Sequence, residues 1–239
     1  REVMASLSAV GAAAVFYPVS QQLSADFSPT RVDATRAVLA GTYFGFPQDL
    51  TIFREYCART GAALIEDNAH GMFSRDSDGQ LLGGRGDAGV FSFRKTIAVP
   101  DGAALVLTGR RELPQTPRDT RGRLLSPRYP IKQAFRRLTG SLGPRRTLHA
   151  IRLIRMVSKT IGGEAVAVGP PDPETRIPLA RDPPALIGRP IAVAEPALEA
   201  ARRRALYDLA SRILGSVGAV PVFPQLPMNA VPYGFPVLA

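Results

Sequence analysis

The chain has 239 residues, of which 45% are hydrophobic, and its 30 Lys and Arg against 20 Asp and Glu give a net charge of +10. This size and hydrophobic content exclude a disordered chain and favour one large domain or a domain and a half. No apolar stretch reaches the roughly 18 residues of a membrane helix, and the single Cys57 excludes an internal disulfide, so we expect a soluble, cytoplasmic protein with a buried thiol rather than a cysteine nucleophile.

The first third of the sequence alternates helical and strand-like patterns. Residues 2–10 have helical spacing, and the apolar runs 12–19 and 36–45 predict two strands. A helix is predicted from residue 50 until Gly61 ends it. Its apolar side chains are expected on one face: Leu50, Ile52, Phe53, Tyr56 and Cys57.

Three more strands are predicted before residue 110. Residues 62–67 form an apolar run that ends in two carboxylates, and residues 86–95 and 103–109 follow after a glycine-rich loop. A strand, a helix and a strand in this order predict a parallel sheet with a right-handed crossover. We therefore expect an α/β fold with a mainly parallel sheet.

The positive charge is concentrated between Arg110 and Lys159, where acidic residues are rare. A solvated connector surface is the first interpretation of this segment. A site for a sugar diphosphate is the second, because guanidinium groups suit phosphate oxygens. Nucleic-acid binding ranks third, because the segment lacks interleaved aromatic residues and matches no recognised motif.

The C-terminal part returns to regular patterns. Residues 195–214 predict an amphipathic helix, followed by two short strands. We expect three parts: a partial cofactor-binding large domain at 1–112, an arginine- and proline-rich connector with helices at 113–190, and part of a smaller α+β domain at 191–239. Both chain ends are expected to be cut.

Two groups of residues carry candidate chemistry. Asp67 and His70 follow the strand at 62–67, and the carboxyl end of a parallel strand is where open α/β folds bind ligands. Lys95 follows the next strand, and it is one of only three lysines in a chain that takes most of its positive charge from arginine. A lysine can form an imine with an aldehyde, whereas arginine cannot. The alternatives are a turn-capping Asp67, a packed polar His70 and a solvated Lys95.

Four sequence motifs, in order along the chain, favour a functional role for Asp67, His70 and Lys95 over these alternatives. They are YFGFPQDL at residues 43–50, EDNAH at 66–70, GDAGVFSF at 86–93, and PDGAALV at 100–106 after Lys95. Together they resemble the DegT/DnrJ/StrS family of pyridoxal-phosphate aminotransferases of fold type I, which act on nucleotide-sugars. The resemblance covers about residues 12–108, and four motifs at similar spacing are more specific than one.

The resemblance implies roles for single residues. It makes Lys95 the lysine that forms the Schiff base with pyridoxal 5'-phosphate, and Asp67 the partner of the pyridinium nitrogen. It places His70 beside the phenolic oxygen of the ring and Ser92 at the phosphate. It also implies a fold-type-I large domain, a homodimer, a nucleotide-sugar substrate and an amino-acid donor, expected to be glutamate. No metal and no membrane partner are expected.

Two other functions compete with the aminotransferase. A pyridoxal-phosphate sugar dehydratase of similar fold would carry histidine in place of the lysine, so Lys95 argues against it. The other rival is a non-catalytic protein, either a degenerate relative or an arginine-rich nucleic-acid binder. The family's N-terminal phosphate-binding turn has no counterpart in this sequence, so we expect the fragment to bind the cofactor poorly by itself.

Overall fold

The computed structural model describes residues 2–27, 35–97, 99, 102–109 and 188–238. The chain divides into two compact units, Arg1–Ala14 with Pro117–Pro184 and Val15–Thr116 with Ala185–Ala239. In the first unit the described element is helix α1 (Glu2–Ala9), which agrees with the helix predicted at 2–10. The basic segment, Lys132, Lys159 and Asp101 lie outside the described residues.

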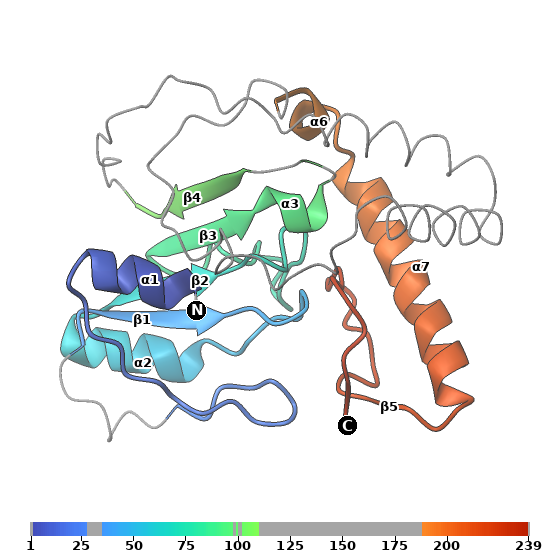
Figure 1. Ribbon diagram of the computed structural model, residues 1–239, viewed down its shortest axis with the longest axis horizontal. Coiled ribbons are helices and arrows are strands. Elements are labelled where there is room, and N and C mark those ends of the chain that lie inside the picture. Colours follow the sequence, from blue (N-terminus) through green and yellow to red (C-terminus); the bar gives the residue numbers. More distant parts are fainter. Residues whose placement is uncertain (1, 28–34, 98, 100–101, 110–187, 239) are drawn as a thin grey trace, which may run out of the picture. The chain divides into compact units, whose positions relative to one another are not determined.

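The second unit is built on a four-stranded sheet in the order β1-β2-β3-β4. Strands β1 (Ala37–Gly41), β2 (Ala63–Asp67) and β3 (Ala88–Ser92) are parallel, and β4 (Ala103–Leu107) is antiparallel to β3. Figure 1 shows these strands in that order, with α2 beside β1 and β2. The predicted α/β fold with a mainly parallel sheet is confirmed.

Helix α2 (Thr51–Thr60) forms the crossover between β1 and β2. It ends at Gly61, whose φ of 74° lets its N–H donate to the Cys57 oxygen. Its inner face packs on the sheet in the main core, which consists of Phe27, Val38, Ala40, Leu50, Phe53, Tyr56, Ala62 and Leu64. Cys57 is half-buried beside this core. The prediction for Ile52 was wrong, because its side chain is 44% exposed.

The strand predicted at 12–19 is absent, apart from one bridge between Val19 and Ala25. Pro18 lies in this run and has no N–H to give to a strand ladder. Tyr17 instead turns its ring onto Phe27, with ring centres 5.5 Å apart. Tyr17 packs against the core, but Val15 and Phe16 are 65% and 78% exposed, so the run as a whole is neither a strand nor a core segment.

A buried ion pair fastens the glycine-rich loop that precedes β3. Arg85 Nη2 lies 2.8 Å from Glu66 Oε2, with side chains 4% and 1% exposed. Glu66 also accepts hydrogen bonds from the backbone N–H groups of Gly83 and Arg85. At Gly89 a Cβ atom would collide with the Gly83 oxygen, so only glycine allows the loop to lie this close to β3.

The C-terminal segment contains helices α6 (Gly188–Ala192) and α7 (Pro196–Gly215), followed by a hairpin of β5 (Val220–Pro221) and β6 (Val237–Leu238). A second core joins it to the loop after β1, where the Phe46 and Phe223 rings stack with centres 3.8 Å apart. Ser74 Oγ accepts from the Val231 N–H and donates to the Gly45 oxygen. These residues therefore pack with the sheet in one unit, while the predicted boundaries at 112 and 190 stay a prediction.

No helix in the described ranges combines the length and the apolar character needed to cross a membrane.

Candidate functional site

The predicted site residues lie at the carboxyl edge of the parallel strands. Asp67 is the last residue of β2, where it is in register with Gly41 of β1 and Val90 of β3. Ser92 is the last residue of β3, and because side chains alternate along a strand it shares a face with Val90 and Asp67. This edge is the usual ligand-binding edge of open α/β sheets.

Lys95 lies on a short helix that directly follows β3. Helix α3 (Phe93–Thr96) begins after Ser92, whose side chain makes no cap hydrogen bond, and it ends as the Ile97 N–H donates to Phe93. The Phe93 N–H also donates to the Gly102 oxygen at the start of β4. The strand predicted at 86–95 is thus shorter than expected, and Lys95 is half-buried on a turn that is anchored at both ends.

His70 lies in the turn after β2 and contacts Lys95. The turn is held by Asp67 Oδ1, which accepts from the Ala69 N–H, and by the buried Asn68, whose amide donates to Gly71 and Leu82. His70 Nε2 lies 3.0 Å from Lys95 Nζ. Lys95 and His70, which follow the neighbouring strands β3 and β2, therefore lie within hydrogen-bond distance of each other.

Burial and charge both act on His70. Burial, and secondarily the charge of Lys95, lower its pKa from 6.5, while the carboxylate of Asp67 works in the opposite direction. Burial also raises the pKa of Tyr43, with Asp67 as the second cause. His70 is therefore neutral near pH 7, and Asp67 is close enough to act on both rings.

The C-terminal segment supplies contacts to this site that the sequence analysis missed. The Tyr233 ring stacks on His70, with centres 4.5 Å apart and planes 3° apart. Arg203 Nη2 on α7 donates to the backbone oxygens of Lys95 and Thr96 at 3.5 and 3.2 Å. Arg203 Nε donates to Glu199 Oε1 at 2.7 Å. The spacing of Glu199 and Arg203 signals a helix ion pair, but nothing in the sequence links Arg203 to Lys95.

Two residues of the motifs, Asp87 and Gly45, shape the backbone around the site. Asp87 Oδ2 accepts from the Leu64 N–H and so joins the loop before β3 to β2. Gly45 has a φ of 87°, and a Cβ there would collide with the Val231 oxygen. Both positions shape the strand ends without pointing a reactive group into the site.

The chemistry of the grouped side chains suits a cofactor that carries an aldehyde and a basic ring nitrogen. An amine, an imidazole and a strand-end carboxylate lie together, from Lys95, His70 and Asp67. Beside them Thr96 Oγ1 is buried without a hydrogen-bond partner. Among the described residues no group of three His, Cys, Asp or Glu is placed to hold a metal ion.

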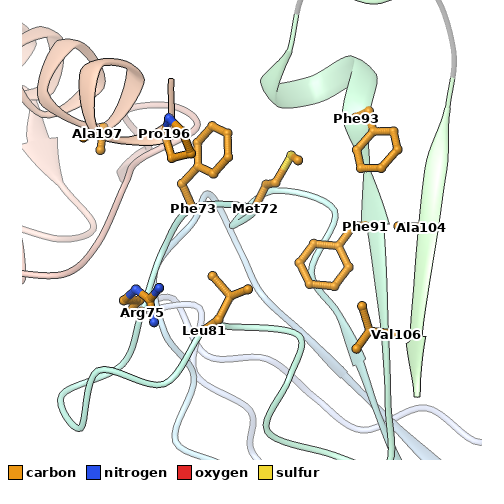
Figure 2. A pocket seen from close by; sticks show the side chains of 11 residues that line it. Met72, Phe73, Arg75, Leu81, Phe91, Phe93, Ala104, Val106, Pro196 and Ala197 are labelled. Carbon is orange, nitrogen blue, oxygen red and sulfur yellow. The ribbon is translucent and has the colours of Figure 1, made fainter. Parts of the chain in front are cut away.

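A hollow of about 530 Å³ lies apart from Lys95 and His70, between β3, β4 and the start of α7. Figure 2 shows Phe91 and Val106 lining it together with Met72 and Leu81. Phe91 follows Val90 in β3, so it lies on the face opposite Asp67. This hollow is almost wholly apolar and includes no predicted site residue, so we do not place the chemistry there.

Solved structures with a similar fold cover nearly the whole chain. Two of them are the aminotransferase TlmJ from Streptoalloteichus hindustanus (TM-score 0.56, 22% identity, 96% of this chain) and PseC from Helicobacter pylori, an aminotransferase involved in the biosynthesis of pseudoaminic acid (TM-score 0.55, 16% identity, 97% of this chain). A DegT DnrJ EryC1 StrS aminotransferase from Brucella abortus is similar as well (0.53, 15%, 98%). The chain spans 54% of the length of each.

At these identities the structural likeness establishes the fold, which is the mainly parallel α/β fold of these aminotransferases. The sequence adds a match to a family model. Residues 3–115, which include β1 to β4 and every predicted site residue, match the DegT/DnrJ/EryC1/StrS aminotransferase family. This match covers slightly less than half of the chain.

Proposed function

We propose that this chain is part of a pyridoxal-phosphate-dependent aminotransferase that transfers an amino group from an amino acid, expected to be glutamate, to a nucleotide-linked keto-sugar. Polysaccharide or secondary-metabolite biosynthesis is the expected setting. The observation that carries the proposal is the placement of Lys95 Nζ 3.0 Å from His70 Nε2, at the strand edge that ends in Asp67. The family is generally dependent on pyridoxal phosphate.

Each site residue receives a chemical role in this proposal. The cofactor supplies an aldehyde and a ring that accepts electrons when it is bound. Lys95 provides the amine that holds the aldehyde covalently, and after its release the same amine carries a proton between carbon atoms. Asp67 holds a proton on the ring nitrogen through a charge-assisted hydrogen bond. His70 contacts the phenolic oxygen side, and Ser92 donates its hydroxyl to the phosphate.

The assembly around this site is also part of the proposal. Fold-type-I enzymes generally build their sites at a dimer interface, so we propose a homodimer, located in the cytoplasm. The sugar dehydratase remains disfavoured, because the chain carries Lys95 where those enzymes have histidine. Nucleic-acid binding rests only on the basic segment at 110–159, which lies outside the described residues.

The decisive experiment uses the complete protein with added pyridoxal phosphate. A visible imine absorption band should form, and borohydride should abolish it and leave the cofactor attached to the Lys95 peptide. Lys95→Ala should lose the band and transamination, whereas Lys132→Ala and Lys159→Ala should keep both, because those lysines fall outside the matched motifs.

Two results would count against the proposal. Full activity of Lys95→Ala would exclude the mechanism, even with the fold unchanged. Absence of an imine, together with DNA retention that weakens steeply as salt rises, would favour the nucleic-acid binder.

A further inference from the structure

Arg203 on α7 reaches the turn that carries Lys95. Its Nη2 donates to the Thr96 oxygen at 3.2 Å, and the Lys95 oxygen shares the same nitrogen at 3.5 Å. The Arg203 side chain is only 15% exposed, so its charge is held largely out of solvent beside α3. A charge in such a place is stable only when hydrogen bonds and ion pairs replace its hydration.

The end of α3 offers acceptors for this guanidinium. The last carbonyl groups of a helix have no partner within the helix, and α3 has only four residues, Phe93–Thr96. The Phe93 oxygen accepts from the Ile97 N–H at 2.7 Å, whereas the oxygens of Lys95 and Thr96 lie beyond that bond and face Arg203. Arg203 therefore caps the turn at its C-terminal end, where a cation is favoured.

The other side of Arg203 is fixed to the C-terminal segment. Its Nε donates to Glu199 Oε1 at 2.7 Å, and its Nη1 lies 3.5 Å from the Pro232 oxygen. Its guanidinium carbon lies 6.0 Å from the centre of the Tyr233 ring, and that ring stacks on His70 with planes 3° apart. The same guanidinium therefore contacts both α3 and the segment that covers His70.

The two ends of Lys95 have separate contacts. Its backbone oxygen faces Arg203, and its Nζ lies 3.0 Å from His70 Nε2. We propose that Arg203 is a positioning residue that fixes the end of α3 on the C-terminal segment and so directs Lys95 Nζ to the carboxyl edge of the sheet. This inference rests on the proposed function, in which the Lys95 amine must meet the cofactor aldehyde. A misplacement of about 1 Å can reduce such a rate about 100-fold.

The contacts of Arg203 require a guanidinium rather than a positive charge alone. The nitrogens of arginine lie in one rigid plane, and here each of them faces a different acceptor: Nε faces Glu199, Nη1 faces Pro232, and Nη2 faces α3. A lysine has one charged nitrogen on a flexible chain. It can reach one of these acceptors, but it cannot hold all of them in a fixed relation.

The next residue on α7 supplies a matched control. Arg204 Nη1 donates to the oxygens of Pro227 and Ala230 at 2.6 and 2.7 Å. Within the described residues these hydrogen bonds tie the same C-terminal segment to α7 and do not involve α3. A general loosening of the C-terminal segment should therefore follow from Arg204→Met, whereas loss of the α3 contacts should follow from Arg203→Met.

The first test is hydrogen exchange of the complete, cofactor-free protein, measured by mass spectrometry of peptides that contain Ile97. In Arg203→Met the Ile97 N–H, which closes α3, should exchange about tenfold faster, as the loss of one hydrogen bond from a charged donor predicts. Amides of α2 should keep their wild-type rates. Arg204→Met should leave the Ile97 rate unchanged. An unchanged rate in Arg203→Met, or equal acceleration in Arg204→Met, would overturn the proposal.

A second variant decides the outcome if Arg203→Met also accelerates exchange in α2 and so disturbs the whole fold. Arg203→Lys keeps the charge and most of the apolar chain. It should accelerate the Ile97 exchange while α2 stays protected, because one nitrogen cannot replace the three-way contact. Wild-type exchange at Ile97 in Arg203→Lys would overturn the proposal.

The second test follows Lys95 itself in the complete protein. The rate at which the visible imine band forms is measured against the concentration of pyridoxal phosphate. Arg203→Met should lower the limiting rate roughly 10- to 100-fold, with little change in the cofactor concentration that gives half of it, because the contacts that bind the cofactor are untouched. Arg204→Met should keep the wild-type limiting rate. Equal losses in the two variants, or an effect on the half-saturating concentration alone, would contradict the proposal.

These measurements separate the inference from the proposed function, because hydrogen exchange requires no cofactor. A wild-type protein that forms no imine would refute the proposed function, and the Ile97 exchange would still decide whether Arg203 holds α3. A protein in which Arg203→Met forms the imine at the wild-type rate would refute only the role of Arg203.

Discussion

Replacing Glu66 with glutamine tests how strongly the buried ion pair holds the loop before β3. Glu66 Oε2 lies 2.8 Å from Arg85 Nη2, and the carboxylate also accepts from Arg85 Nε and from the N–H groups of Gly83 and Arg85. Glutamine keeps one acceptor oxygen but places an NH2 group against these donors. Removal of one partner of a buried pair costs about 3–5 kcal/mol, because the remaining charge is left without compensation.

The measurement is the free energy of unfolding from urea denaturation of wild type and Glu66→Gln. Arg202→Gln is the matched control, because it breaks a pair with Glu199 of similar length, 3.1 Å, whose arginine is 64% exposed. An exposed pair contributes about 0–1 kcal/mol. Equal losses in the two variants, or a loss below about 1 kcal/mol for Glu66→Gln, would refute the role given to burial.

Three further predictions follow from the geometry around the site. Gly45→Ala should lower the free energy of unfolding more than Gly61→Ala. Both glycines have a positive φ, which costs a residue with a side chain about 1–2 kcal/mol, but only at Gly45 would the added Cβ also collide with backbone atoms. Because the pKa of His70 is lowered on folding, the unfolded state binds more protons below about pH 6.5. Wild type should therefore lose more stability than His70→Gln as the pH falls through this range. Parallel plots of unfolding free energy against pH for the two proteins would contradict this. Asp67→Asn should retain cofactor better than it retains turnover, since it removes the charge that keeps the ring nitrogen protonated; equal losses in cofactor titration and steady-state rate would argue against that role.

Local sequence patterns predicted most of the four-stranded sheet and helix α2. Gly61 ends α2 where the sequence indicated, and the apolar runs around β1 and β2 are strands with the expected parallel pairing. The strand prediction at 12–19 was wrong, because an apolar run does not by itself establish strand pairing, and Val15 and Phe16 of this run are exposed. Tyr17 packs its ring on Phe27 and Phe53 and donates its hydroxyl to the Leu39 oxygen, and only the three-dimensional structure reveals these contacts.

The contacts of the site were less predictable than its residues. Asp67, His70 and Lys95 stand out because of residue type, motif and position after strands. Tyr233 and Arg203 come from more than 100 residues further along the chain than Lys95, and their sequence neighbours indicate only a helix and a short strand. Long-range packing onto Phe44 and α3 brings them to the site, and periodicity carries no information about such contacts.

The two adjacent carboxylates at the end of β2 show what the register adds to the sequence. Residue type alone does not distinguish Glu66 from Asp67, since both follow the same apolar run. Alternation along the strand turns Glu66 toward the face of Leu64, where Arg85 neutralises it at 1% exposure, and leaves Asp67 half-buried on the other face. The strand thus assigns one acid to stability and leaves the neighbouring acid available for a ligand at the carboxyl edge.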